Sequence, residues 1–438
     1  MMKRAKGFNE ASQLLTRTNT LEHGTPPGLA AHIRQAFGRE LSVQEVVDRI
    51  IGKVRDEGDE ALFGFAQQLD GVLLNSLETD RQEVVDAYDI TDSRVISALE
   101  FAARRIRDFH LACGHKVGVF PVGKHLSQRV QPLRRVGLYV PGGSAAYPST
   151  VLMMAIPAKV AGVEEIIMLS PPGADGRIPA ATLVAADIAK VSRVFKIGGA
   201  QAIAALAFGT ESVPRVDKIC GPGNIFVTTA KKTVYGTVGI DGLEGPSELM
   251  IVADEKANPV LCAADLLAQA EHDPMTSVIL VTTSADLADR IDKEIQTQLK
   301  KLKRHATVQV VVDKGLLAVV DNMSQAIDLV NLFAPEHLSL MISDPAALVS
   351  EVRNAGCIFL GDNSPVVLGD YVAGPSHVLP TGGSARFGSP LGVADFLKVT
   401  NIIAVDGPAM QELGQPAAVI AQAEGFDAHA RAVERRLK

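Results

Sequence analysis

Glu336 and His337 are adjacent, and a carboxylate beside an imidazole is what a reaction with two different proton transfers would use. The pair lies in residues 331–381, which hold most of the polar candidates in the chain. Pro335 ends a helical pattern and residues 338–342 have the composition of a short buried strand, so the pair lies at a helix-to-strand junction. Loops held by rigid elements tend to carry chemistry, but a surface Glu beside a hydrogen-bonded His at a turn is an equal alternative.

Gln269 and His272 are three residues apart near the end of an expected helix over residues 259–272, so they share one face of its last turn. One amide and one imidazole at that spacing could chelate a divalent metal with partners from elsewhere in the chain. Gln is an uncommon ligand, and a His at a helix end is favoured by the helix dipole anyway. On local grounds alone the metal site is the weaker interpretation.

Asp370 and His377 lie in GDYVAGPSHVLPT, where Gly and Pro predict a turn-rich loop, so both side chains could face one cavity. The alternative is an Asp that caps a turn and a solvent-facing His. His429 is a lone imidazole in a tail of Ala, Glu and Arg, and a surface His is its more common explanation.

Three expected strands run into glycine-containing turns at residues 141–143, 198–201 and 221–224. Ligands of doubly wound sheets bind beyond the carboxyl ends of the strands, and glycine lets the backbone approach a phosphate. The sequence contains neither GxGxxG after a strand nor GxxxxGK[ST], so both common nucleotide motifs are missing. Three such turns in one domain still favour a nucleotide crevice.

Short apolar runs alternate with Ala-rich helical patterns from about residue 120 onward, which predicts parallel sheets covered by helices on both faces. A capping box of Ser42 and Glu45 opens an earlier helix. Strands are expected at residues 136–140, 166–169, 194–197, 216–219, 249–252, 278–282, 308–312, 338–342 and 357–360. Helices are expected at residues 93–110, 150–161, 179–190, 200–208, 259–272, 285–302, 324–332 and 346–353, and after Gly223.

Composition limits the classes of function. The chain has 438 residues, 47% apolar and 21% charged, which suggests two large ordered domains. A net charge of −7 without a basic stripe, and the absence of Trp, argue against nucleic acid and anionic membrane as partners. The four cysteines form no CxxC and indicate reduced thiols. The N-terminus lacks the apolar region of a signal peptide, and the longest apolar run, residues 151–158, is too short to span a membrane, so we expect a soluble cytoplasmic protein.

Nine ordered segments together resemble the histidinol dehydrogenase family, over nearly the whole chain from about residue 30. They are RVGLYVPGG, YPSTVLM, GGAQAIAALAFGT, KICGPGN, GPSE, QAEH, FAPEHL, GDYVAGPSHVLPTGG and EGFDAH. The resemblance implies an enzyme that oxidises L-histidinol to L-histidine, the last step of histidine biosynthesis. It implies two NAD-dependent steps through L-histidinaldehyde, one zinc ion per site, and a homodimer whose C-terminal tail crosses to the partner.

The resemblance also implies roles for particular residues. Its acid/base pair falls on Glu336 and His337. Its zinc ligands fall on Gln269, His272, Asp370 and His429. Its substrate contacts fall on Ser247, Gln269, His272, His337, Asp370, Glu424 and His429, with His377 nearby. Its NAD contacts fall on Tyr139, Gln201 and Asn224.

With the resemblance, the fold class becomes two incomplete Rossmann-like (doubly wound) α/β/α domains with small N- and C-terminal helical extensions. Residues 1–30 form the N-terminal extension. Residues 31–120 and 247–381 form a first domain with the acid/base pair and metal ligands, and residues 121–246 a second, NAD-binding domain. Residues 382–438 form a helical tail that is too small to fold alone, which fits a tail that crosses to the partner subunit.

The expected mechanism follows the chemistry of these groups. His337 accepts the alcohol proton as hydride leaves to NAD, and Glu336 activates the water that hydrates the aldehyde before the second hydride leaves. Zinc would bind the imidazole and amine of histidinol and orient it, whereas a competing mechanism uses zinc as a Lewis acid on the alcohol oxygen. Position 376 is Ser where we associate the family with Asn, which bears on the orientation of His377.

Two alternatives remain open from the sequence. The first is a family relative that oxidises another small alcohol, such as a sulfonated diol, with the same NAD and zinc. Glu424 and His429 favour histidinol over that substrate. The second is a non-catalytic two-domain binding protein with a structural metal, in which the Glu336–His337 pair would have no purpose. Cys220, beside the turn at residues 221–224, is expected to serve packing.

Overall fold

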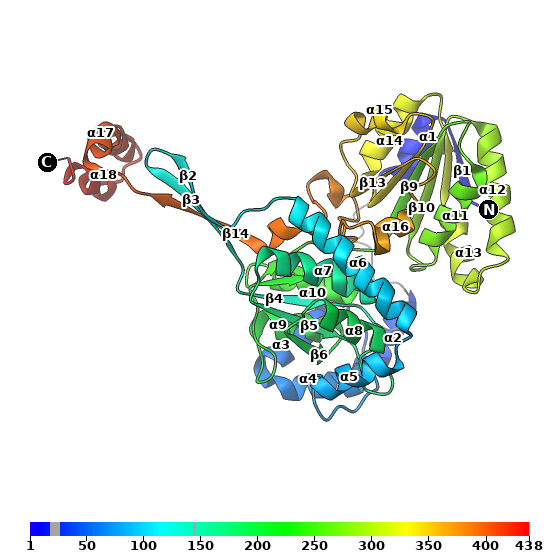
Figure 1. Cartoon of the computed structure of the whole chain (residues 1–438), viewed down its shortest axis with the longest axis horizontal. Helices are drawn as coiled ribbons and strands as arrows, with labels where there is room; N and C mark the ends of the chain where they lie inside the picture. The colour runs from blue at the N-terminus through cyan, green and yellow to red at the C-terminus, as the bar shows by residue number, and fades with distance from the viewer. Residues whose placement is uncertain (18–26, 143–145, 438) are drawn as a thin grey trace. The chain divides into compact units, whose positions relative to one another are not determined.

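The chain forms two compact units in a computed structural model that describes residues 1–17, 27–142 and 146–437 (Figure 1). The larger unit comprises residues 1–114 and 133–396, and the smaller one residues 115–132 and 397–438. Each unit is described by itself below. No helix in the described ranges is long and apolar enough to cross a membrane.

A six-stranded parallel sheet in the larger unit carries the candidate catalytic residues. Its strand order is β1 (Lys3–Lys6), β11 (Leu316–Val319), β10 (Ser277–Thr282), β9 (Glu248–Ala253), β12 (His337–Met341) and β13 (Cys357–Leu360). Every residue of β9 and β12 is buried, as expected for strands covered on both faces. The register places His337 opposite Leu249 at the start of both strands.

Helices cover both faces of this sheet, and the alternation of side chains along β9 shows how. Leu249 and Ile251 pack with α11 (Pro259–Ala270), α12 (Ala285–Leu299) and α13 (His305–Lys314). Met250 and Val252 point to the other face and pack with α1 (Phe8–Leu15) and α14 (Met323–Phe333). Strand β9 is therefore apolar from Leu249 to Ala253, because both of its faces are core.

A second parallel sheet in the same unit has five strands. Its order is β6 (Arg193–Lys196), β5 (Glu165–Ser170), β4 (Arg135–Tyr139), β7 (Lys218–Cys220) and β8 (Gly239–Ile240). The helices that pack on this sheet or on one another beside it are α2 (Pro27–Phe37), α3 (Val43–Glu57), α4 (Asp59–Leu69), α5 (Arg81–Ile90), α6 (Ser93–Ala112), α7 (Pro148–Ala161), α8 (Ala180–Ile188), α9 (Gly199–Phe208) and α10 (Ile225–Val234). The two Rossmann-like α/β domains predicted from the sequence are confirmed.

The last part of the larger unit contains short helices and 3₁₀ turns besides β13. They are α15 (Pro345–Leu348), η2 (Val349–Glu351), α16 (Val366–Tyr371), η3 (Ser384–Arg386) and η4 (Val393–Phe396). The helix expected at residues 346–353 is therefore only one α-helical turn followed by a 3₁₀ turn.

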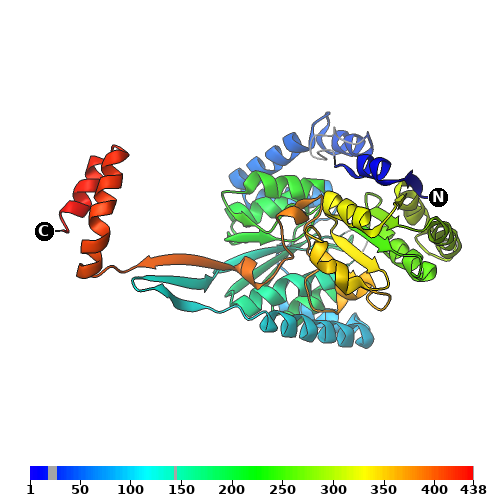
Figure 2. The same ribbon diagram turned by 90° about the horizontal axis from the view of Figure 1, so that it is seen from above.

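The smaller unit combines an antiparallel sheet with two helices. The sheet order is β14 (Leu397–Ile403), β3 (Leu126–Pro132) and β2 (Gly118–Gly123). Figure 2 shows the strands as one ribbon, cyan and orange, followed by α17 (Gly407–Ala423) and α18 (Asp427–Glu434) in red. These two helices pack against each other.

Several sequence predictions are wrong in detail. Residues 308–312, predicted as a strand, lie in α13, and the strand is β11. Val308, Val311 and Val312 are buried whereas Val310 is 44% exposed. Burial therefore follows the spacing of a helix, although the run of β-branched residues is typical of a strand. The N-terminal extension was predicted to be helical, but Lys3–Lys6 is an edge strand. Its lysines are typical of an edge strand and give it no apolar pattern from which a strand could be predicted. Residues 18–26 of that extension lie outside the described part.

The grouping of segments also differs from the prediction. Helices α3 and α4, in the range 31–120, pack on the five-stranded sheet and not on the six-stranded one. The predicted helical tail, residues 382–438, contains strand β14, and its first residues up to Phe396 belong to the larger unit. Strand β3, which pairs with β14, and strand β2, which pairs with β3, were not predicted, because this two-sided, exposed ribbon lacks a clear hydrophobic alternation.

Candidate active site

The junction between α14 and β12 buries Glu336 and His337. Helix α14 ends at Ala334, which has φ 54° and ψ 67°, and Pro335 cannot continue the helix. Strand β12 begins at His337. Glu336 is 6% exposed and His337 3% exposed, so the alternative of a surface Glu at a turn is wrong.

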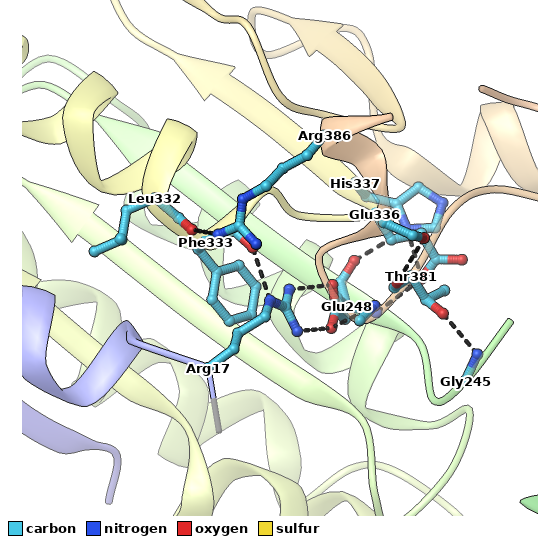
Figure 3. Close-up of polar contacts among 11 residues, drawn as sticks. Arg17, Gly245, Glu248, Leu332, Phe333, Glu336, His337, Thr381 and Arg386 are labelled. Carbon is cyan, nitrogen blue, oxygen red and sulfur yellow. Dashed lines mark hydrogen bonds and ion pairs between the residues drawn. The ribbon is translucent and has the colours of Figure 1, made fainter. Parts of the chain in front are cut away.

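Both side chains bind the backbone of Glu248, the first residue of β9 (Figure 3). The Glu248 N–H donates to Glu336 Oε2 at 2.8 Å. His337 Nδ1 lies 3.1 Å from the Glu248 carbonyl, and because a carbonyl only accepts, Nδ1 carries a proton. This bond directs Nε2, the other ring nitrogen, toward Asp370 Oδ1 at 3.6 Å. In the neutral ring this arrangement fixes one tautomer, with Nε2 as the unprotonated nitrogen.

The electrostatics of His337 are set by its acidic neighbours. Burial lowers the pKa of the imidazole, but the charge of Glu336 with its hydrogen bond, and then the charge of Asp370, raise it to about 9. The pair of carboxylates therefore stabilises a proton on the ring once it has been accepted.

Asp370 and His377 meet, as the turn-rich loop suggested. Asp370 lies in α16 and is 7% exposed. His377 Nδ1 is 2.7 Å from the Asp370 carbonyl, and its Nε2 is 3.1 Å from Thr150 Oγ1 in α7. Burial lowers the pKa of His377, which fits a neutral ring that donates to the carbonyl and accepts from the hydroxyl. His377 thus ties the two α/β domains together and is not solvent-facing.

Ser376 supports the loop without fixing the imidazole directly. Its hydroxyl donates to the Met153 carbonyl at 3.2 Å and accepts from the Val378 N–H at 3.2 Å. The orientation of His377 comes from Asp370 and Thr150 instead. Ser at position 376 is therefore compatible with an ordered His377.

The four candidate zinc ligands lie in different settings. Gln269 is in the last turn of α11 and 2% exposed, and its Nε2 has no hydrogen-bond partner among the described residues. His272 is exposed just beyond the end of α11, so the predicted helix is two residues too long. Asp370 is buried near His337, and His429 belongs to α18 of the smaller unit. Across the described ranges, no group of three or more His, Cys, Asp or Glu forms a metal site.

The donor types still fit zinc, since imidazole, carboxylate and amide oxygen are ligands that it accepts. Gln269 would bind a metal through its amide oxygen, whereas the atom that lacks a partner among the described residues is Nε2, a donor that requires an acceptor beside it.

The candidate NAD residues lie at the carboxyl edge of the five-stranded sheet. Tyr139 ends β4, and its hydroxyl accepts from the Gly199 N–H at 3.1 Å. Gln201 is 2% exposed in the first turn of α9, and its Oε1 lacks a partner within the described residues. Asn224 is the N-cap of α10, where its side chain accepts from two backbone N–H groups. Gly143, of the first predicted glycine turn, lies outside the described residues.

The remaining candidate substrate contacts divide between the units. Ser247 directly precedes β9, next to Glu248. Glu424 caps the C-terminus of α17 and is exposed, and His429 is exposed with its ring 5.2 Å from that of Phe426. Sequence reasoning missed Glu248 and Thr150 as the residues that hold the two histidines. The GPSE segment contains Glu248, but nothing in the sequence indicated a backbone role.

The doubly wound fold, the buried carboxylate–imidazole pair and the polar residues at the carboxyl edge of a parallel sheet are typical of an α/β enzyme that binds a nucleotide. Comparison with known families makes this specific: the family model described as histidinol dehydrogenase matches residues 34–437. This chain belongs to the histidinol dehydrogenase family.

Similar proteins cover the whole chain. A histidinol dehydrogenase of Dehalococcoides mccartyi is 50% identical over 442 residues, which is 100% of both chains. One from Halalkalibacterium halodurans is 48% identical over 90% of this chain and 94% of its own. The crystal structure of histidinol dehydrogenase from Elizabethkingia anophelis superposes with a TM-score of 0.91 at 32% identity, covering 100% of this chain and 98% of that one.

Proposed function

We propose that this enzyme oxidises L-histidinol to L-histidine through L-histidinaldehyde, with NAD accepting a hydride in each of two steps. The observation that carries the proposal is the buried Glu336–His337 pair fixed on the backbone of Glu248, in a chain of the histidinol dehydrogenase family. The same burial and bonding argue against a non-catalytic binding protein.

In the first step His337 Nε2 takes the proton of the alcohol while hydride leaves to the nicotinamide. The bond from Nδ1 to the Glu248 carbonyl keeps the ring in place during this transfer. In the second step Glu336 accepts a proton from the water that adds to the aldehyde. As water adds, protonated His337 returns its proton to the aldehyde oxygen, which gives the hydrate and a neutral ring. The hydrate then loses its hydride to a second NAD, and His337 takes its hydroxyl proton.

Gln269, His272, Asp370 and His429 would hold the zinc ion of this enzyme. When bound, zinc would supply a fixed positive centre for the imidazole and amine of histidinol. Ser247, His377 and Glu424 would complete the contacts to the substrate, and Tyr139, Gln201 and Asn224 would line the NAD site. The Oε1 of Gln201, which has no partner within the described residues, supports a ligand with a hydrogen-bond donor at the NAD site.

We also propose a homodimer in which the smaller unit completes the site of the partner subunit. This unit carries exposed apolar side chains, among them Ile403 at 71%, Val122 at 62% and Val399 at 58%. A unit so small does not bury enough apolar surface to be stable alone, and such a patch marks a protein interface. Glu424 and His429 would reach the other subunit from it.

A cytoplasmic location is the last part of the proposal. All four cysteines are free, and Cys113 is exposed, which is compatible with a reducing compartment.

The test is the amount of NADH formed per L-histidinol consumed, with zinc present and again after chelation. We expect two NADH and histidine as product, activity lost on chelation and restored by zinc. One NADH would remove the role given to Glu336. No NADH with histidinol, but turnover of another small alcohol, would replace the substrate and support the sulfonated-diol alternative.

A further inference from the structure

Arg17 binds directly to the residue that holds the catalytic pair. Its two terminal nitrogens lie 2.6 and 2.7 Å from the two carboxylate oxygens of Glu248, a bidentate ion pair. Its guanidinium also stacks 3.8 Å from the ring centroid of Phe333. Arg17 follows α1 in the N-terminal segment, before residues 34–437, which the family model matches.

Glu248 connects this arginine to the chemistry (Figure 3). Its side chain is 6% exposed and is bound by Arg17 and by the Gly382 N–H at 3.2 Å. Its backbone N–H and carbonyl bind Glu336 and His337. One residue therefore receives Arg17 on its side chain and presents both backbone groups to the acid/base pair.

Arg17 also fixes the other segment that leads to the pair. Its Nε donates to the Phe333 carbonyl at 2.8 Å, at the C-terminus of α14. Arg386 donates to the preceding carbonyl, Leu332. These carbonyls have no partner inside the helix, and two positive charges suit the negative end of the helix dipole. Glu336 lies only three residues beyond Phe333, so both segments flanking the site meet at Arg17.

The charges around Glu248 explain why an arginine is needed here. Glu248 and Glu336 are neighbouring buried carboxylates, and two buried negative charges repel each other. Arg17 is the positive side chain hydrogen-bonded to the Glu248 carboxylate among the residues that the structure describes. Removing it would leave Glu248 unpaired, and Glu248 would move toward other donors and carry its backbone with it.

We propose that Arg17 is a positioning residue for the Glu336–His337 pair, supplied by the N-terminal segment that precedes the family match. The proposal rests on the proposed function, since it assigns the pair as the acid/base machinery. It gives the first residues of the chain a role in catalysis without contact to substrate.

The test compares Arg17→Met with Arg4→Met. Arg4 lies in the same N-terminal segment and forms ion pairs with Asp289 and Asp292, away from the catalytic pair, so it is a matched control. We expect Arg17→Met to lower kcat by about 10- to 100-fold, because a misplacement of about 1 Å has effects of that size. The KM for NAD should stay within about twofold. Arg4→Met should keep the wild-type kcat.

Adding Glu248→Gln to Arg17→Met provides a rescue. The double variant has no unpaired buried carboxylate at position 248, so its kcat should exceed that of Arg17→Met several-fold. Such non-additivity of two substitutions is expected of residues in direct contact. If Arg17→Met does not fold, Arg17→Lys replaces it, with a smaller fall in kcat expected because one ammonium cannot bind both oxygens. A kcat of the soluble Arg17 variant equal to that of Arg4→Met would overturn the proposal.

A second measurement needs no substrate and separates this proposal from the proposed function. In protein labelled with ¹⁵N-histidine, the ring Nδ1–H of His337 should give a slowly exchanging signal, assigned by its loss in His337→Asn. We expect the signal to be kept in Arg4→Met and shifted or broadened in Arg17→Met. An unchanged signal in Arg17→Met would contradict a positioning role, whereas a wild-type enzyme inactive on histidinol would contradict only the substrate.

Discussion

Glu336 and His337 share one anchor, the backbone of Glu248, but face different tasks. In the proposed mechanism the His337 ring is held at Nδ1, so Nε2 is the nitrogen that exchanges a proton with substrate. Glu336 is bound through one oxygen to a backbone N–H. The two groups can therefore be removed separately, each with its own effect on the two oxidation steps.

His337→Asn should lower kcat by about 10²- to 10⁴-fold for both steps, the usual contribution of a general base. Glu336→Gln should still oxidise the alcohol but hydrate the aldehyde slowly, so that NADH per histidinol falls from two toward one. Single-turnover NADH measurements on both variants check this. Two NADH at the wild-type rate from Glu336→Gln would show that another group activates the water.

The proposed zinc ligands give a second prediction for single residues. Replacing His272 or His429 with Ala should lower bound zinc after dialysis, measured by metal analysis, because each removes one of four ligands. His305→Ala is the control, an exposed His at the start of α13 with no assigned role. Equal zinc in all three variants would remove these two ligands from the proposal.

A buried lysine stabilises the turn that would hold the cofactor. Lys231 in α10 is 1% exposed, and its Nζ donates to the Gly221 carbonyl at 2.9 Å. It also pairs with Asp241 and Glu244, each at 2.6 Å. Asp241 in turn accepts from the Gly221 N–H at 2.6 Å. The cluster ties the turn after β7 to the segment after β8.

Lys231→Met should lower the free energy of unfolding by about 3–5 kcal/mol, because it leaves two buried carboxylates without their cation. Urea denaturation measures this. Lys232→Met, an exposed neighbour in the same helix, should change it by less than about 0.5 kcal/mol. Similar midpoints for the two variants would mean that the carboxylates are neutral in the folded protein.

Most elements of the two sheets were predictable because a strand buried on both faces is an uninterrupted apolar run, as in residues 249–252. The errors have physical causes too. The valines of α13 have strand propensity, but their burial follows the helix, so tertiary packing overrides propensity. Glu336 and His337 were visible as residue types. Their anchor was not, because a backbone contact at Glu248 leaves no mark on side-chain identity.

For the whole molecule, the proposed tail exchange predicts complementation between two inactive chains. His337→Asn and His429→Ala are each expected to be inactive alone. A mixed dimer would contain one site with both changes and one site with neither, if the tail completes the partner's site. Co-expression and reassortment should then restore about a quarter of wild-type activity, since half of the dimers are mixed and have one working site.

Absence of activity in the mixed preparation, with mixed dimers verified by differently tagged chains, would place His429 in the site of its own subunit. Mixing His337→Asn with His272→Ala is the control. Both changes lie in the same part of the chain, so no arrangement of the tails can produce an intact site from that mixture.

The pairing of β1 with β11 has a consequence for the time course of synthesis. Lys3 lies opposite Leu316 in the sheet, so the partner of this strand is made long after it. At about 5–20 residues per second, roughly 15–60 s separate the two on the ribosome. During that interval Lys3–Lys6 has no sheet edge to join, and Arg17 gains its partner carboxylate only once Glu248 has been made. If Arg17 positions the Glu336–His337 pair as proposed, the pair is complete only after residues 3–17 have docked onto segments that are made much later.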